Sequence, residues 1–198
     1  DEDEPEVLYT GLTHSREPLS MMNLFYFVQN LVESYGIDSS EANYLINERE
    51  LWFIPVVNPD GYIYNEQIEP DGGGMHRKNR RDTGCGLGTQ RGVDLNRNYG
   101  YGWGANDTGS SPDPCSAIYR GESAFSEPEI EIVKDFILNR NFKNVLHYHS
   151  FGNVYIHPYG DGSYPDYGDL MIYRGLAQEM SDLNNFNFGT GYETIGYT

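Results

Sequence analysis

The sequence has few basic residues: 13 lysines and arginines stand against 30 aspartates and glutamates, and the formal net charge is −17. Such a chain has little with which to neutralise the phosphates of a nucleic acid, so we expect no nucleic-acid partner. The acidic excess predicts a well-solvated surface, and acidic loops could also hold Ca²⁺. Of these two interpretations, solvation is favoured.

Long apolar runs are also missing. No stretch approaches the roughly 20 apolar residues that a membrane-spanning helix needs, and the opening Asp-Glu-Asp-Glu does not resemble a signal peptide. Hydrophobic residues still make up 38% of the 198 residues, which is enough for a substantial core. We therefore expect residues 1–198 to form one globular domain without a membrane span.

Cysteine is nearly absent, since Cys85 and Cys115 are the only two. Both lie in a region rich in glycine, serine, asparagine and proline, where two cysteines form a disulfide more often than a metal site. Closing that loop would stabilise the fold by about 3 kcal/mol. Disulfides persist in oxidising compartments, so we expect a secreted or periplasmic protein.

Apolar runs alternate with helical patterns along the chain. Strands are predicted over 6–12, 51–57, 145–149 and 154–157, and helices from Pro18 to Gly36, from Ser126 onward and over 170–183. The alternation predicts an α/β fold with a mixed, largely parallel twisted sheet flanked by helices.

Turn and cap residues punctuate this pattern. Asn58-Pro59-Asp60-Gly61 predicts a turn, and Ser126 with Glu129 predicts a capping box at a helix start. Residues 65–118 hold most of the glycines and few periodic apolar positions, which indicates a long functional loop region.

Candidate metal ligands follow two of the predicted strands. His14 and Glu17 come after the first strand, and His149 ends the third. Two imidazoles and one carboxylate suit Zn²⁺ with a fourth position open for water. The H-x-x-E spacing alone is a weak signal, with surface hydrogen bonding as the alternative. His147 competes with His149, because alternation places both on one face of the strand.

Arginines cluster in the loop region of this acidic protein. Arg77, Arg80 and Arg81 lie close together, and Arg97 follows beside two asparagines. A charge run is usually a solvated face, but arginines beside a metal could pair with a substrate carboxylate or stabilise a developing oxyanion. Zinc with such an arginine points to hydrolysis of an amide near a free carboxyl terminus.

Several motifs, in this order, resemble the zinc metallocarboxypeptidases of the carboxypeptidase A/B type over nearly the whole chain. They are His14-Ser15-Arg16-Glu17, Asn58-Pro59-Asp60-Gly61-Tyr62, Arg77-Lys78-Asn79-Arg80, Gly92-Val93-Asp94-Leu95-Asn96-Arg97-Asn98, Tyr119-Arg120-Gly121 with Ser126-Glu127-Pro128-Glu129, and His149-Ser150-Phe151 with Pro158-Tyr159-Gly160.

The resemblance implies a role for each matched residue. It implies one zinc ion held by His14, Glu17 and His149, which decides against His147. Arg77 would be the catalytic arginine that stabilises the oxyanion. The implied substrate-binding residues are Asn96 and Arg97 for the terminal carboxylate, Arg16 further from the cleaved bond, and Phe151, which stands where a tyrosine is common. Cys85 and Cys115 also fall where family members commonly have a disulfide.

The implied activity is zinc-dependent removal of the C-terminal residue from peptides or proteins by a metal-activated water. The resemblance places the general-base glutamate and a mobile active-site tyrosine beyond Thr198, and further chain before Asp1. We therefore expect residues 1–198 to be the central part of one catalytic domain, truncated at both ends. The alternatives are a non-catalytic domain that binds zinc and C-terminal peptides, and a zinc amidohydrolase acting on N-acyl amino acids or cell-wall peptides.

Overall fold

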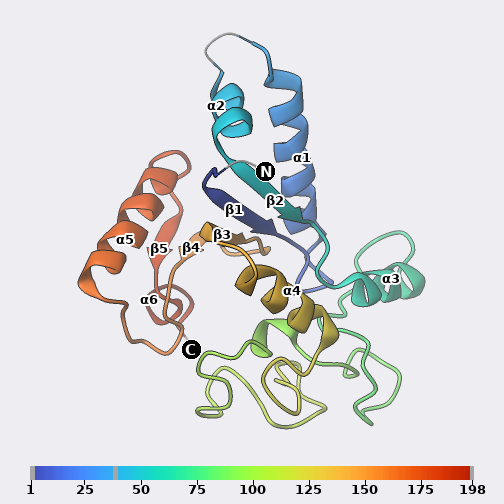
Figure 1. Ribbon diagram of the computed structural model, residues 1–198. Coiled ribbons are helices and arrows are strands. Elements are labelled where there is room, and N and C mark those ends of the chain that lie inside the picture. Colours follow the sequence, from blue (N-terminus) through green and yellow to red (C-terminus); the bar gives the residue numbers. More distant parts are fainter. Residues whose placement is uncertain (1–2, 38–39, 197–198) are drawn as a thin grey trace. The chain divides into compact units, whose positions relative to one another are not determined.

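The computed structural model describes residues 3–37 and 40–196, which form two compact units (Figure 1). The first unit holds the chain up to Trp103 together with Ser111–Ser150, and the second holds Gly104–Ser110 and the chain from Phe151 onward. That the two units act as one catalytic domain stays a prediction.

A parallel sheet of three strands is the centre of the first unit. Its order is β2 (Glu50–Ile54), β1 (Glu6–Thr10) and β3 (Phe142–His147), and both strand pairs are parallel. The predicted α/β fold with a largely parallel sheet is thus confirmed. Because parallel strands end at the same edge, the residues that follow β1 and β3 meet there.

Helices cover both faces of this sheet. Tyr9 and Phe53 lie side by side in register with ring centroids 5.0 Å apart, and Phe27 of α1 (Pro18–Ser34) packs 5.3 Å from Tyr9. The neighbouring Trp52 points to the other face, where its ring lies 5.5 Å from Phe136 of α4 (Pro128–Leu138). Two buried faces explain the continuous apolar strands of a parallel sheet.

The buried core extends past the ends of the strands. Val57 after β2, Leu95 of the short helix η1 (Leu95–Arg97), and Ile130 and Val133 of α4 form one apolar cluster. Leu95 and Ile130 have no exposed surface. The cluster therefore fixes the irregular segment around residue 95 against α4, beside the carboxyl edge of the sheet.

Two local expectations were wrong, and both concern helix starts. The predicted turn at Asn58 is the start of α3 (Pro59–Ile68), because the Asn58 side chain accepts a hydrogen bond from the Gly61 amide and Pro59 fits the first helical turn. The capping box at Ser126 is absent, since α4 has Glu127 as its N-cap and the Ser126 hydroxyl donates to the Glu127 carboxylate instead. The helix α2 (Glu41–Glu48), capped by Ser40, was not predicted.

The predicted disulfide is present. Cys85 and Cys115 are bonded, with Cα atoms 5.2 Å apart, in the irregular region between α3 and α4. The Lys78 ammonium donates to the carbonyls of Pro114 and Ser116 on either side of Cys115, at 3.3 and 2.8 Å. Lys78 has no exposed surface, and this burial lowers its pKa to about 8. The disulfide loop is thereby tied to the segment that carries Arg77.

The second unit contains a small parallel sheet and two helices. Strands β4 (Val154–Ile156) and β5 (Asn187–Gly189) pair directly, and α5 (Tyr167–Asp182) overlaps the predicted helix over 170–183. The short β5 and α6 (Gly191–Ile195) were not predicted, although α6 has a capping box made by Thr190 and Glu193.

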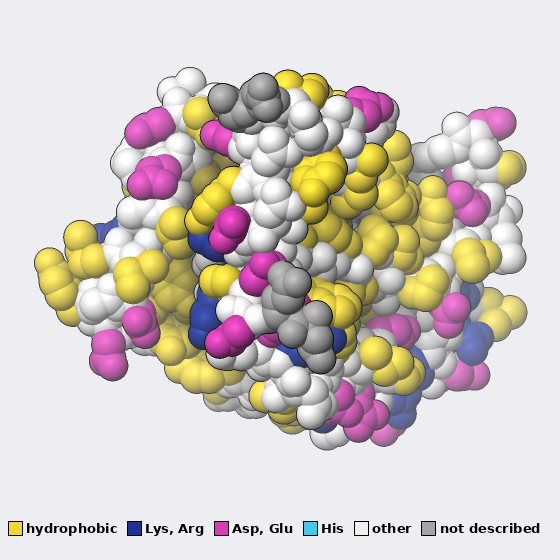
Figure 2. All heavy atoms as spheres, turned by 45° about the horizontal axis from the view of Figure 1, so that its top comes forward, with side chains coloured by type: hydrophobic (Ala, Val, Ile, Leu, Met, Phe, Trp, Pro, Cys, Tyr) yellow, Lys and Arg dark blue, Asp and Glu magenta, His cyan; other side chains and the backbone are white. Residues whose placement is uncertain are grey.

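Acidic side chains are scattered over the molecular face shown in Figure 2 rather than gathered in one patch. This distribution agrees with the expected solvated surface of a chain whose net charge is −17. Among the described residues, every helix is too short or too polar to cross a membrane.

Candidate metal centre

The loop after β1 is held by a buried serine. Ser20, in the first turn of α1, accepts a hydrogen bond from the Leu12 amide at 2.9 Å and donates to the Glu17 carbonyl at 2.7 Å. Its side chain is fully buried. These bonds fold residues 12–17 back onto α1, so that His14 and Glu17 point to the carboxyl edge of the sheet.

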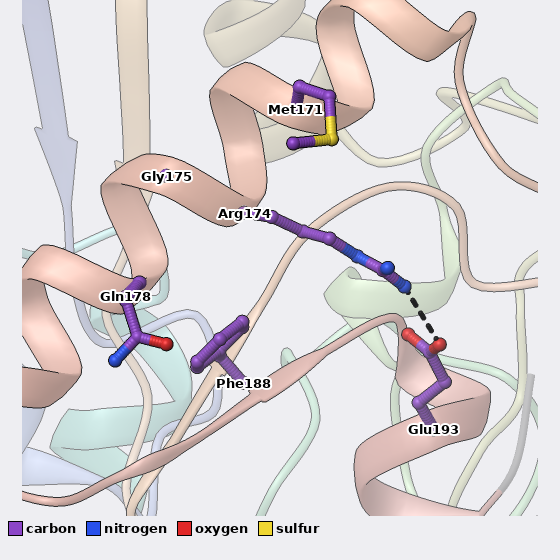
Figure 3. A pocket seen from close by; sticks show the side chains of 6 residues that line it. All are labelled: Met171, Arg174, Gly175, Gln178, Phe188 and Glu193. Atoms are coloured by element: carbon purple, nitrogen blue, oxygen red, sulfur yellow. Dashed lines mark hydrogen bonds and ion pairs between the residues drawn. The ribbon is translucent and has the colours of Figure 1, made fainter.

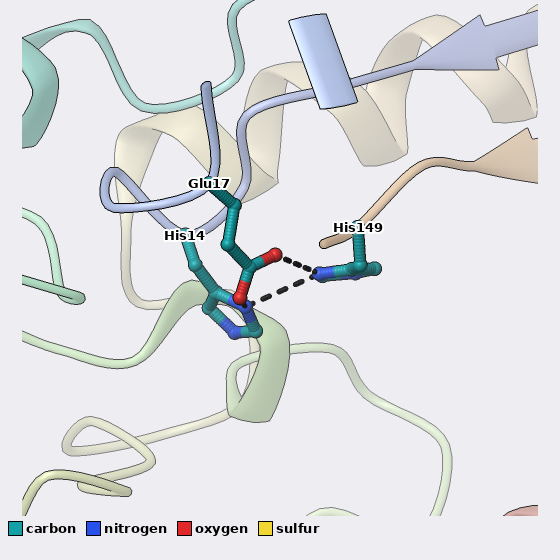
Figure 4. Close-up of side chains that lie close together, drawn as sticks. All are labelled: His14, Glu17 and His149. Carbon is teal, nitrogen blue, oxygen red and sulfur yellow. Dashed lines mark hydrogen bonds and ion pairs between the residues drawn. The ribbon is translucent and has the colours of Figure 1, made fainter. Parts of the chain in front are cut away.

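Three side chains meet at that edge (Figure 4). The Glu17 carboxylate lies between two imidazoles, with Oε1 2.8 Å from His14 Nδ1 and Oε2 2.9 Å from His149 Nδ1. The two Nδ1 atoms are themselves 3.1 Å apart. His14 and Glu17 are buried, whereas the His149 side chain is 30% exposed. The group is therefore reachable from solvent on the His149 side.

This donor set fits a zinc ion. Ligand atoms at 2.0–2.1 Å from a tetrahedral zinc lie about 3.3 Å from one another, close to the spacings seen here. His14 Nε2, on the far side of its ring, lies 3.2 Å from Asp94 Oδ1, and a carboxylate at that position commonly orients a metal-binding histidine. His147 does not join the group, since its Nδ1 lies 2.6 Å from the Thr10 hydroxyl.

Asp94 joins the metal-ligand group to Arg77. The Arg77 Nε and Nη2 atoms donate to Asp94 Oδ2 at 3.0 and 2.8 Å, and Arg77 Nη1 lies 3.4 Å from His14 Nδ1. Burial acts to raise the pKa of the fully buried Asp94, but the close contact with His14 and the charge of Arg77 outweigh it and hold the pKa well below its usual range. An ionised Asp94 thus fixes both the imidazole and the guanidinium.

Glu17 is also ionised at neutral pH. Burial acts to raise its pKa, but the hydrogen bonds with His14 and His149 lower the pKa from 4.5 to about 2. At a pH between these two pKa values, Glu17 is ionised in the folded chain and largely protonated in the unfolded chain, so the folded chain binds fewer protons. The free energy of unfolding of the metal-free protein should therefore fall as the pH drops from about 5 to 2, with a Glu17 contribution of about 3 kcal/mol.

Urea unfolding in the presence of a chelator, at pH 5 and pH 3, measures a little over half of this contribution, about 2 kcal/mol, because the folded-state pKa of about 2 lies below pH 3. Glu17→Gln should show a smaller loss between the two pH values than the unmodified protein. Glu131→Gln, which changes an exposed carboxyl of α4, should keep the full loss. An equal loss in all three proteins would contradict the low pKa of Glu17.

Comparison with known proteins places the chain in a family. The family model described as zinc carboxypeptidase matches residues 1–196. The chain belongs to the zinc carboxypeptidase family. The resemblance inferred from the motifs is therefore confirmed, and the match extends over both units.

Individual zinc carboxypeptidases show the same similarity. The chain is 34% identical to a carboxypeptidase B of Astacus astacus over 196 residues, which cover 96% of this chain and 60% of that protein. It is 39% identical to a carboxypeptidase B of Helicoverpa zea over 168 residues, or 82% of this chain and 36% of that protein. The crystal structure of carboxypeptidase A from Helicoverpa armigera superposes with a TM-score of 0.80 at 30% identity, covering 96% of this chain and 46% of that one.

Two features of these comparisons concern the activity of the whole protein. The chain spans between about a third and two thirds of the length of these curated relatives. Some further relatives, at 32% identity, are named inactive metallocarboxypeptidases. Family membership therefore establishes the fold and the relationship of the chain to zinc carboxypeptidases.

The remaining predicted site residues have different surroundings. Asn96 and Arg97 lie half-buried in η1, the short helix that begins directly after Asp94. The Arg97 guanidinium donates to the Asn96 carbonyl at 2.9 Å. Arg16 is exposed in the loop between the two ligands His14 and Glu17. Phe151 belongs to the second unit, where its side chain is fully exposed.

Sequence reasoning gave no role to three residues that hold this site together. They are Asp94, Asn58 and Asn65, all of which are buried. Asp94 and Asn58 lie inside the recognised motifs, which was the available signal. Asn65 lies outside every motif, and only the folded arrangement identifies it.

A pocket of about 550 Å³ lies in the second unit, between α5 and the β5–α6 segment (Figure 3). It is lined by Met171, Arg174, Gly175, Gln178, Phe188 and Glu193. The Arg174 guanidinium is paired with the Glu193 carboxylate at 3.1 Å, so the charges in this pocket already neutralise each other. None of the predicted site residues lines it.

Proposed function

We propose that the protein containing this chain is a zinc-dependent exopeptidase that removes the C-terminal residue of peptides. The observation that carries the proposal is the convergence of His14, Glu17 and His149 beside the Arg77–Asp94 pair, in a chain of the zinc carboxypeptidase family. When bound there, zinc would supply Lewis-acid chemistry and activate a water molecule.

The chain's own residues would bind and orient the substrate. Arg97 and Asn96 would fix the terminal carboxylate, so that only the last peptide bond reaches the site. Arg77, held by Asp94, would donate hydrogen bonds to the carbonyl oxygen of that bond as negative charge develops on it. Arg16 and Phe151 would contact the substrate further away. The base that takes the proton from water is assigned to no residue of this chain.

The disulfide between Cys85 and Cys115 supports action in an oxidising compartment, and we propose a secreted or periplasmic location. Calcium binding and the absence of a nucleic-acid partner stay predictions from the charge balance.

Hydrolysis by the full-length protein tests the proposal. A blocked dipeptide with a free carboxyl terminus should be cleaved, its C-terminal amide should not, and a zinc chelator should stop the reaction until zinc is restored. Faster cleavage of N-acyl amino acids would favour an amidohydrolase. Tight binding of C-terminal peptides without cleavage would favour a non-catalytic domain, as the names of some relatives suggest.

Replacing Arg97 by alanine tests the assignment of the carboxylate site. We expect KM for free-carboxylate peptides to rise about 10- to 100-fold with a small change in kcat, because a charge-assisted hydrogen bond contributes about 1.5–3 kcal/mol. Arg140→Ala is the control, since Arg140 pairs with Glu6 at the opposite end of the sheet. An unchanged KM in Arg97→Ala would remove Arg97 from this role.

A further inference from the structure

Two loops without regular secondary structure carry the chemistry of the candidate site. Residues 13–17 carry His14 and Glu17, and residues 76–78 carry Arg77. The two loops are in direct contact, since the Ser15 amide donates to the Arg77 carbonyl at 3.2 Å and the Ser15 hydroxyl donates to the His76 carbonyl at 2.6 Å. Their relative position decides how far the Arg77 guanidinium lies from the ligand atoms.

Asn58, the N-cap of α3, bridges these loops. Its side-chain amide nitrogen donates to the Thr13 carbonyl at 3.2 Å and to the Lys78 carbonyl at 3.1 Å. Its side-chain oxygen accepts from the Gly61 amide at 3.0 Å, and the residue has no exposed surface. The three hydrogen bonds of this buried side-chain amide are therefore all made with backbone groups.

Asn65, further along α3, makes the same kind of bridge. Its amide nitrogen donates to the Ser15 carbonyl at 3.0 Å and to the His76 carbonyl at 2.9 Å, and its oxygen accepts from the His76 amide at 2.8 Å. Asn65 is buried, and a Cβ at Gly74 would come within 2.6 Å of its side chain. Each asparagine thus donates one hydrogen bond to the loop that carries the metal ligands and one to the loop that carries Arg77.

The four accepting carbonyls belong to the residues directly before and after His14 and Arg77. Thr13 precedes His14 and Ser15 follows it, while His76 precedes Arg77 and Lys78 follows it. We propose that Asn58 and Asn65 are positioning residues that set the distance between Arg77 and the metal ligands. The inference rests on the proposed hydrolysis, because a fixed arginine matters most where charge develops in a transition state.

The aspartate variant of Asn65 isolates this role. Asn65→Asp keeps the shape and the acceptor for the His76 amide, but it turns a carboxylate oxygen toward the carbonyls of Ser15 and His76. Both bridging hydrogen bonds are lost and the two loops can move apart. A shift near 1 Å can cost about 100-fold in rate, so we expect kcat to fall about 10- to 100-fold while KM changes less than about threefold.

A double-mutant cycle shows whether Asn65 acts through Arg77. The full-length zinc protein is compared as the unmodified form, Asn65→Asp, Arg77→Ala and the double variant. In the Arg77→Ala background, Asn65→Asp should lower kcat by less than about threefold, because the group that it positions is gone. Asn139→Asp, which removes an exposed amide bond to the Asp135 carbonyl, should leave kcat unchanged.

A second readout does not depend on activity. In the metal-free protein, hydrogen exchange of the Ser15 amide should speed up at least about tenfold in Asn65→Asp, while exchange of amides in β1 stays the same. If Asn65→Asp does not fold, Asn65→Ser supplies the same cycle without a new charge.

Equal losses of kcat in both backgrounds, with unchanged Ser15 exchange, would overturn the positioning role. An unmodified full-length protein that binds zinc but cleaves no peptide would instead overturn the proposed function. Ser15 exchange would then still decide whether Asn65 joins the two loops.

Discussion

Replacing His14 by alanine is expected to abolish both zinc retention and peptide hydrolysis. Among the described residues, His14 contributes one of the three ligand atoms of the candidate centre, and Asp94 contacts the other nitrogen of its ring. Loss of an outer partner typically costs about 10- to 100-fold in metal affinity or activity, so loss of a direct ligand should cost more than that. Zinc bound per chain after dialysis, and kcat/KM for a blocked dipeptide, measure the two effects.

A matched surface variant separates this effect from general damage. Glu131→Ala removes an exposed side chain of α4 and should retain zinc and activity. Added zinc should not restore His14→Ala to the activity of the unmodified protein. A variant that keeps one tightly bound zinc and full activity would show that the ion is held elsewhere.

Replacing Arg77 by alanine is expected to lower kcat about 10²- to 10³-fold with little change in KM. Removal of one preorganised donor to a developing oxyanion has an effect of this size. The guanidinium already lies 3.4 Å from His14 Nδ1, so a carbonyl oxygen beside the ligands would come within its reach. Steady-state kinetics with a free-carboxylate peptide separate kcat from KM.

Two further measurements guard this interpretation. Arg77→Ala leaves the buried Asp94 without its guanidinium partner, and this loss can lower the free energy of unfolding by about 3–5 kcal/mol. The assays should therefore be run well below the measured Tm of the variant. Zinc content should stay unchanged. Arg77→Lys keeps a positive charge but not the planar fork, and its kcat should fall between the other two. A loss confined to KM would assign Arg77 to substrate binding alone.

The sequence predicted the parts of the fold that depend on local pattern. Apolar runs predicted β1 and β2, and helical spacing predicted α1 and most of α5. The same local reasoning interpreted Asn58-Pro59-Asp60-Gly61 as a turn, although an asparagine before a proline also caps a helix, as it does in α3. Ser126 failed as a cap because its hydroxyl bonds to the Glu127 carboxylate.

In the candidate site, too, the sequence predicted some residues and missed others. The ligand types and motifs indicated His14, Glu17 and His149, which the fold brings within 4.8 Å of one another. Asn58 and Asn65 could not be found from spacing, because they bridge backbone atoms that lie far away along the chain. Asn65, for example, bonds to Ser15 and His76, and nothing in its neighbouring sequence marks it.

The distance in sequence between His14 and His149 has a consequence for biosynthesis. Their Nδ1 atoms lie 3.1 Å apart, and the strands that precede them, β1 and β3, are paired in parallel, so neither histidine can be placed by a local hairpin. A ribosome must have released the chain beyond residue 149 before all three ligands can meet. Binding of zinc by all three ligands therefore has to follow the synthesis of both β1 and β3.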